Sequence, residues 1–99
     1  MARFDVYQGK NSEVVYLLDC QADMLDVFGT RFVVPLHRAS GARAADRLHP
    51  IFEVEDERVV MVTHLALAVP LNALGARVTN LADEQPRIMG ALDMLITGY

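Results

Sequence analysis

The sequence predicts a mainly β domain that ends in a single α-helix. Short runs rich in β-branched and aromatic residues recur along the first two thirds of the chain, which is typical of strands. The charged tetrapeptide Glu55–Arg58 separates two of these runs, as a hairpin turn would. Apolar residues at helical spacing follow in residues 88–99. A chain of 99 residues is long enough for one core, so we expect a single domain over residues 1–99.

The first third of the chain contains three expected strands. Phe4–Tyr7 alternates apolar and polar positions, and residues 14–18 form a continuous apolar run whose strand should be buried on both faces. Residues 21–29 mix acidic and apolar side chains and are expected to form a loop. The strand pattern resumes at residues 31–34. Pro35 has no N–H to donate, so this strand should end near it or lie at a sheet edge.

The middle of the chain is expected to contain a short helix, a hairpin and an edge segment. The Ala- and Arg-rich residues 37–48 favour a helix. Residues 51–54 and 59–62 are the two strands of the hairpin. The composition of residues 65–74 fits a helix, but Val69 precedes a proline and therefore disfavours one, so we expect an extended edge segment there.

The last segment is expected to be an amphipathic helix. Asp83 is a candidate N-cap, and Pro86 falls in the first turn, where backbone N–H groups have no helical partner. Apolar side chains at spacings of three and four form one face: Ile88, Met89, Leu92, Leu95 and Ile96.

Composition indicates a folded protein that binds partners other than nucleic acid. Hydrophobic residues make up 53% of the chain, more than a small domain readily buries, and a homodimer would cover the remainder. The net charge of −4, from 13 acidic and 9 basic residues, disfavours direct nucleic-acid binding. Arg38, Arg43 and Arg47 are interpreted as a solvated loop.

Cysteine content and hydropathy indicate a cytoplasmic protein. Cys20 is the only cysteine, so no internal disulfide forms, and we interpret it as a packing residue rather than a nucleophile. The N-terminus lacks the pattern of an export signal, and no apolar run approaches the ~20 residues of a membrane span. We therefore expect no membrane association.

No motif in the sequence predicts a metal, a cofactor or a catalytic group. His37, His49 and His64 lack the close spacing that places two metal ligands on one helix face or turn. The acidic residues Asp19, Asp23 and Asp26 lack the pattern of a calcium loop. The glycines never reach a phosphate-binding spacing. We predict a binding protein rather than an enzyme.

Several short motifs, read in order, resemble one known family. The matching positions are Val6-Tyr7, Leu18-Asp19, Gln21, Asp23–Asp26, Arg31, Val33–Leu36, Leu48–Pro50, Val69-Pro70 and Gly75. In this order they resemble the CcdB family of toxins, and the resemblance runs from Phe4 to Tyr99. It implies an SH3-like barrel of the CcdB/Kid/MazF type. Such a barrel has an antiparallel sheet, a small second sheet and one C-terminal helix, and it forms a homodimer through the face carrying that helix.

The resemblance also implies a function and partners. The chain would be the toxin of a type II toxin–antitoxin system, which binds the A subunit of DNA gyrase and traps the enzyme on cleaved DNA. A CcdA-like antitoxin would neutralise it. The implied gyrase-binding residues are Met24, Leu25, Asp93, Ile96, Thr97, Gly98 and Tyr99. Thr97 occupies a position where a tryptophan in the family stacks on an arginine of gyrase, which a threonine does not do.

Two alternative functions share the expected fold. The first is a ribonuclease toxin of the Kid/MazF type, with Arg31, Thr63 and His64 as candidate acid–base residues. The negative net charge disfavours it. The second is a homologue that binds an antitoxin but is not toxic.

Overall fold

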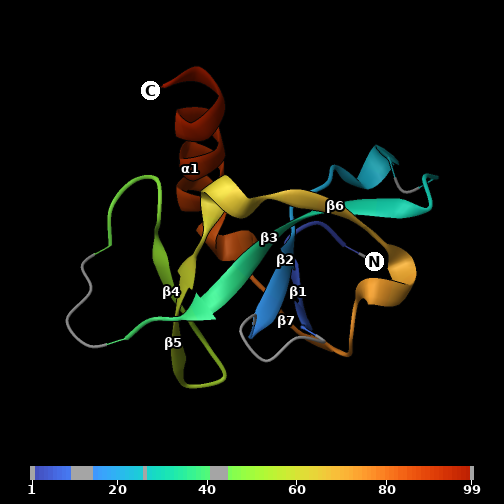
Figure 1. The fold of residues 1–99 in the computed structure, drawn as a ribbon, viewed down its shortest axis with the longest axis horizontal. Coiled ribbons are helices and arrows are strands. Elements are labelled where there is room, and N and C mark those ends of the chain that lie inside the picture. The colour runs from blue at the N-terminus through green and yellow to red at the C-terminus, as the bar shows by residue number, and fades with distance from the viewer. Residues whose placement is uncertain (1, 10–14, 26, 41–44, 99) are drawn as a thin grey trace.

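A computed structural model describes residues 2–9, 15–25, 27–40 and 45–98 (Figure 1). Expectations that concern Val14, Asp26, Arg43 and Tyr99 lie outside these residues. The strands are β1 (Asp5–Gln8), β2 (Tyr16–Asp19), β3 (Thr30–Arg38), β4 (Ile51–Val54), β5 (Glu57–Met61), β6 (Leu67–Pro70) and β7 (Arg77–Asn80). The helix α1 (Gln85–Thr97) closes the chain, and four short 3-10 helices are η1 (Asp23–Leu25), η2 (Thr63–Leu65), η3 (Leu71–Ala73) and η4 (Ala82–Glu84).

The strands form one curled antiparallel sheet in the order β4-β5-β3-β2-β1-β7, and β6 pairs with β3 (Figure 1). The prediction of a mainly β fold with a single C-terminal helix is confirmed. The described residues contain no separate second sheet, because the long strand β3 joins the β4–β5 hairpin to the rest. On one side β3 pairs with β2, and on the other it pairs with β6 along its first half and with β5 along its last residues.

Pro35 lies inside β3, and β3 has partner strands on both sides, which corrects the expectation that the strand ends near Pro35 or lies at a sheet edge. Pro35 stands opposite Leu17 of β2. On the other side of β3, β6 pairs with residues 30–33 and β5 with residues 36–38, so Pro35 lies where the partner strand changes. Its carbonyl accepts a hydrogen bond from the Val62 N–H at 3.0 Å. A residue without an N–H is tolerated at such a break in the ladder.

The predicted helix over residues 37–48 does not form in the described part of that segment. His37 and Arg38 belong to β3, where they pair with Val60 and Val59 of β5, and residues 45–50 contain only bends. Arg38 therefore lies on a strand rather than in a solvated loop. Strand pairing, a nonlocal contact, overrides the local helix propensity of the segment.

The hairpin of β4 and β5 is confirmed, with a two-residue turn at Glu55 and Asp56. Both residues have positive φ, 53° and 62°, as a turn whose twist matches the flanking strands requires. The expected edge segment corresponds to β6, which in the described sheet pairs only with β3. The sequence did not predict β7, which pairs with β1.

The helix α1 packs on the sheet through its first half. Ile88, Ala91 and Leu92 are buried, and they join a core that is formed mainly by the first five strands. The helix is preceded by η4, and no side chain caps it, so the predicted Asp83 cap is wrong. Pro86 lies in the first turn as predicted. In the described residues, no helix is both long enough and apolar enough to cross a membrane.

Candidate partner-binding site

The last two turns of α1 extend beyond the sheet and expose apolar side chains. Of the predicted apolar face, Ile88 and Leu92 are buried, whereas Leu95 is 41% exposed and Ile96 is 77% exposed. Figure 1 shows the end of α1 projecting from the body of the molecule. An apolar face that continues past the last core contact is available for another protein.

The end of the helix is closed by its own hydrogen bonds. Gly98 has a φ of 82°, and its N–H donates to the Met94 carbonyl at 2.9 Å, which closes the helix with a left-handed C-cap. The hydroxyl of Thr97 donates to the Asp93 carbonyl at 2.7 Å. The Asp93 side chain is exposed. Of the predicted site residues in this helix, only Tyr99 falls outside the described part of the chain.

The other predicted site residues, Met24 and Leu25, lie on η1 in the loop after β2. Met24 is 84% exposed, and Leu25 is 42% exposed. Val27 and Phe28 follow and are also exposed. These four large apolar residues, two on each side of residue 26, have little packing reason to face solvent. This loop is therefore a second candidate contact surface.

Gln21 fastens the loop to the sheet. Its side-chain amide donates to the Leu25 carbonyl at 2.9 Å, and its side-chain oxygen accepts the Phe32 N–H at 3.0 Å. Asp23 accepts the Arg3 N–H at 2.8 Å. Arg3 also places its guanidinium 3.2 Å from the sulfur of Met89 on α1. The Gln-x-Asp part of the motif thus holds η1 in place and connects it to the helix.

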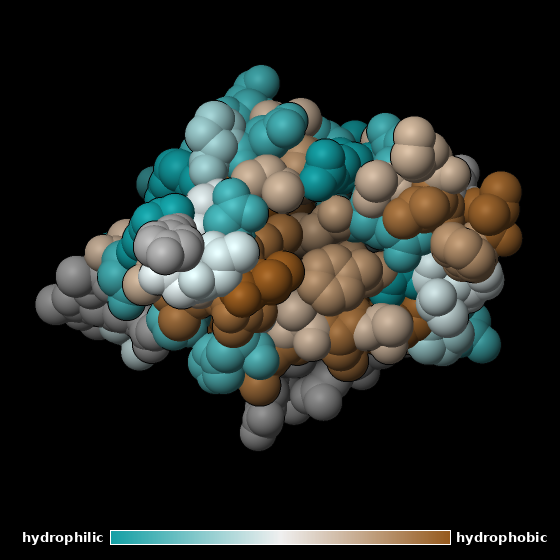
Figure 2. Space-filling view, turned by 90° about the horizontal axis from the view of Figure 1, so that it is seen from above, coloured by the Kyte–Doolittle hydropathy of each residue, from teal (hydrophilic) through white to brown (hydrophobic). Residues whose placement is uncertain are grey.

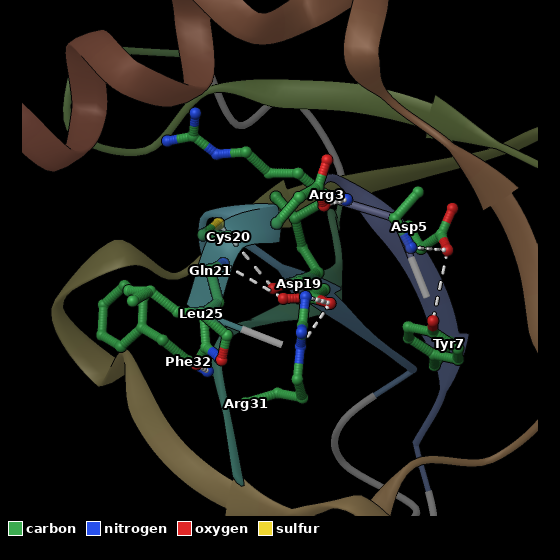
Figure 3. A network of polar contacts seen from close by, with 12 residues as sticks. Arg3, Asp5, Tyr7, Asp19, Cys20, Gln21, Leu25, Arg31 and Phe32 are labelled. Atoms are coloured by element: carbon green, nitrogen blue, oxygen red, sulfur yellow. Dashed lines mark hydrogen bonds and ion pairs between the residues drawn. The ribbon is translucent and has the colours of Figure 1, made fainter. Parts of the chain in front are cut away.

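A buried ion pair between Asp19 and Arg31 lies next to the loop that carries η1 (Figure 3). The Asp19 carboxylate lies 2.6 Å from the Nη2 of Arg31 and accepts a hydrogen bond from its Nε at 2.9 Å. Both side chains are fully buried. The second carboxylate oxygen of Asp19 accepts the Gln21 N–H at 3.1 Å, so the pair leads directly to the residue that holds the loop.

Large apolar side chains with at least a third of their surface exposed come from the loop, from η2 to η3, and from the end of α1. They are Met24, Leu25, Val27, Phe28, Leu65, Leu67, Leu71, Met94, Leu95 and Ile96. Figure 2 looks down on the side to which the end of α1 points, and apolar side chains gather over the middle and right of that face. Figure 1 shows η1 and the end of α1 apart on this side, with β6 between them. We call this side the apolar face.

The candidate catalytic residues are poorly placed to act on a substrate. Burial raises the pKa of the Cys20 thiol to about 12, so it is not an available nucleophile. Arg31 is buried in its ion pair, and Thr63 is buried with its hydroxyl bound to the Leu48 carbonyl at 2.5 Å. Only His64 of the predicted ribonuclease residues is exposed.

The structure brings His49 and His64 together, which the sequence did not predict. Their ring nitrogens Nε2 and Nδ1 are 3.0 Å apart. The contact joins the segment before β4 to η2, two segments whose approach depends on the sheet. Their spacing along the chain gave no signal for it.

Comparison with solved structures defines the class of fold. A Mycobacterium tuberculosis toxin, MazF-mt6, superposes with a TM-score of 0.72 at 12% sequence identity, covering 90% of this chain and 92% of the other. An endoribonuclease from a mycobacterial species, solved with its cognate antitoxin, superposes with a TM-score of 0.71 at 14% identity, covering 95% and 92%. The fold is that of MazF-type proteins, a curled antiparallel sheet with one C-terminal helix.

The family itself follows from the sequence match. The CcdB protein family matches residues 3–98, which is nearly the whole chain. This chain belongs to the CcdB family.

Proposed function

We propose that this protein is the toxin of a type II toxin–antitoxin system, that it binds the A subunit of DNA gyrase, and that it traps gyrase on cleaved DNA. The proposal rests on membership of the CcdB family together with the exposed apolar end of α1. It acts by binding rather than by catalysis, in the cytoplasm, where gyrase and a CcdA-like antitoxin are available. The antitoxin neutralises it by covering part of its surface.

A homodimer through part of the apolar face would leave the rest of that face for gyrase and complete the binding surface. Met94, Leu95 and Ile96 are exposed on one chain, and a two-fold partner would bury part of this helix end against an identical one. The fold separates η1 from the end of α1 within one chain. Pairing two chains through this face supplies two copies of each element, which gyrase would then contact together.

The chemistry of the helix end suits a protein partner. Ile96 offers an apolar side chain, and Asp93 offers an exposed carboxylate for a basic residue of gyrase. Thr97 uses its hydroxyl within the helix, so it contributes little beyond its methyl group. Any aromatic contact in this region would have to come from Tyr99.

Induction in a bacterial host tests the proposal. Cells that express the protein should stop growing and accumulate gyrase-dependent DNA breaks, and the purified protein should bind the dimerisation fragment of the gyrase A subunit. A matched variant is Ile96→Asp, which places a charge on the exposed helix face without touching the buried core. A folded wild-type protein that fails to bind the fragment would contradict the proposal.

The structural similarity to an endoribonuclease makes RNA cleavage the second candidate. Burial of Arg31 and Thr63 speaks against it, since neither side chain reaches the surface. Purified protein incubated with total RNA should leave it intact while gyrase-dependent breaks appear in cells. RNA cleavage that His64→Ala abolishes would replace the gyrase proposal. Antitoxin binding without growth arrest would instead identify a homologue that is not toxic.

Gln21→Ala should weaken toxicity more than stability. The variant removes two of the hydrogen bonds that hold η1 but leaves the buried core unchanged. We expect the affinity for the gyrase fragment to fall by about tenfold, since these bonds keep Met24 and Leu25 in position. Binding assays and melting temperatures check this, with Gln85→Ala at the exposed start of α1 as the control. Equal affinity for Gln21→Ala and wild type would show that η1 is not part of the site.

A further inference from the structure

Two imidazole rings and a carboxylate lie in a row where the segment before β4 meets η2. His49 Nε2 lies 3.0 Å from His64 Nδ1, and the two rings are nearly perpendicular, with an interplanar angle of 83°. On the opposite side of its ring, His49 Nδ1 lies 3.6 Å from a carboxylate oxygen of Asp46. His49 is largely covered, whereas His64 is exposed, so solvent reaches this row of side chains at His64.

The backbone on both sides of the pair is fixed before any ligand arrives. The Asp46 side chain accepts the backbone N–H of His49 at 2.6 Å, which closes a tight turn over residues 46–49. The Thr63 hydroxyl donates to the Leu48 carbonyl at 2.5 Å and is buried. Thr63 and Leu48 immediately precede the two histidines, so this bond ties together the segments that carry them. A preorganised pair of this kind loses little entropy on binding a ligand.

The nearby carboxylate favours the tautomer of His49 that carries its proton on Nδ1. A proton on Nδ1 faces Asp46, and the lone pair of Nε2 then points toward His64. With this tautomer of His49, the contact at 3.0 Å is a hydrogen bond when His64 carries its proton on Nδ1 and donates it to this lone pair. If His64 instead carries its proton on the exposed Nε2, both facing nitrogens present lone pairs. The proton is moved through solvent, so the change leaves the charge of the pair unchanged.

We propose that His49 Nε2 and His64 Nδ1 bind a divalent transition-metal ion of the Zn²⁺ type. Metal–nitrogen bonds of about 2.0–2.1 Å place two tetrahedral ligands about 3.3 Å apart, a few tenths of an ångström more than the observed 3.0 Å. Asp46 is a positioning residue, because a carboxylate on the far nitrogen of a histidine orients the ring and raises its basicity toward a metal. Imidazole ligands favour zinc, copper and nickel over calcium and magnesium.

Water completes the coordination sphere. The described residues contain no group of three or more ligating side chains, so the two histidines are the protein ligands and the other positions remain open. Cys20 is buried and protonated, and it does not compete for the ion. Affinity should therefore be lower than in closed four-ligand sites, and the ion should be removable by a chelator.

Titration of ZnCl₂ into untagged protein, followed by calorimetry, tests the site. Wild type should bind one ion per chain, and His49→Gln and His64→Gln should each abolish binding. His37→Gln is the matched control and should bind like wild type, because His37 lies on β3. Asp46→Asn should weaken binding by about tenfold or more. Saturating zinc should also shift the imidazole NMR signals of His49 and His64 but not those of His37.

Three results would overturn the proposal. These are no saturable zinc binding by wild type, zinc binding that survives both His49→Gln and His64→Gln, or loss of binding in His37→Gln. Circular dichroism of each variant shows whether the fold is retained. None of these measurements depends on toxicity, so they test the metal site independently of the proposed function.

Discussion

Asp19→Ala should destabilise the protein by about 3–5 kcal/mol, because it leaves Arg31 charged, fully buried and without its carboxylate. This is a large share of the roughly 5–15 kcal/mol that holds a typical domain together. Urea denaturation at neutral pH and equal protein concentration measures it. The same substitution removes the acceptor of the Gln21 N–H, so the loop that carries η1 should also lose order.

Two controls distinguish this effect from the loss of any ion pair. Arg38→Ala removes an ion pair with Glu57 at the surface, where the Arg38 side chain is 71% exposed, and should cost no more than about 1 kcal/mol. The double variant Asp19→Leu with Arg31→Met replaces the buried pair by apolar side chains and should recover most of the lost stability. If Asp19→Ala lowers the free energy of unfolding no more than Arg38→Ala does, the Asp19–Arg31 pair is not desolvated in solution. If Asp19→Ala does not fold, recovery in the double variant still tests the argument.

The features that the sequence predicted correctly depend on local patterns. The β4–β5 hairpin follows from apolar runs around a charged turn, and burial of β2 on both faces follows from its continuous apolarity. The errors at Pro35 and over residues 37–48 occur where partners distant in sequence decide the structure. Pro35 is accommodated because β3 changes partner at that point, which no local signal indicates.

Strand β7 also depends on partners that are distant in sequence, and it was not predicted from the sequence. Of its four residues only Val78 is strongly apolar, so the segment has no strand pattern of its own. Its state is determined by pairing with β1 and by Asp5, whose carboxylate accepts hydrogen bonds from Arg77 at 3.0 Å and Asn80 at 2.9 Å. Burial opposes ionisation of Asp5, but these bonds and that of the Ala2 N–H leave its pKa lowered overall. The polar side chains of β7 thus supply donors to a buried carboxylate, and pairing with β1 holds the segment extended.

The sequence proposed candidate site residues but gave no indication of the contacts that position them. The resemblance pointed to Met24, Leu25 and the helix end, and the structure shows that the described ones are exposed. The role of Gln21 was not predictable, because it bonds to Phe32, which lies 11 residues further along the chain on β3. The contact of His49 with His64 likewise depends on the arrangement of the sheet. Long-range hydrogen bonds of this kind leave no periodic signal in a sequence.

Deletion of Gly98 and Tyr99 should abolish toxicity while leaving the fold intact. Beyond Leu92 the described part of the helix has no buried residue, so the core does not depend on its end. The structural loss is the hydrogen bond from the Gly98 N–H to Met94, at an exposed terminus, and should cost about 1 kcal/mol or less. Growth after induction should return to that of cells carrying no toxin, and affinity for the gyrase fragment should fall by at least a hundredfold.

Deletion of Tyr99 alone distinguishes the contribution of Tyr99 to toxicity from that of Gly98. If the aromatic ring supplies the contact that a tryptophan provides at the position of Thr97 in the family, this shorter deletion should be as severe as the longer one. If it retains toxicity, the backbone around the Gly98 cap carries the contact, because the left-handed conformation there presents the end of the helix to a partner. Gln85→Ala, at the other end of α1, should keep full toxicity. A longer deletion that lowers the melting temperature as much as it lowers toxicity would mean that the helix end is structural, and the site would have to lie on the loop of η1 instead.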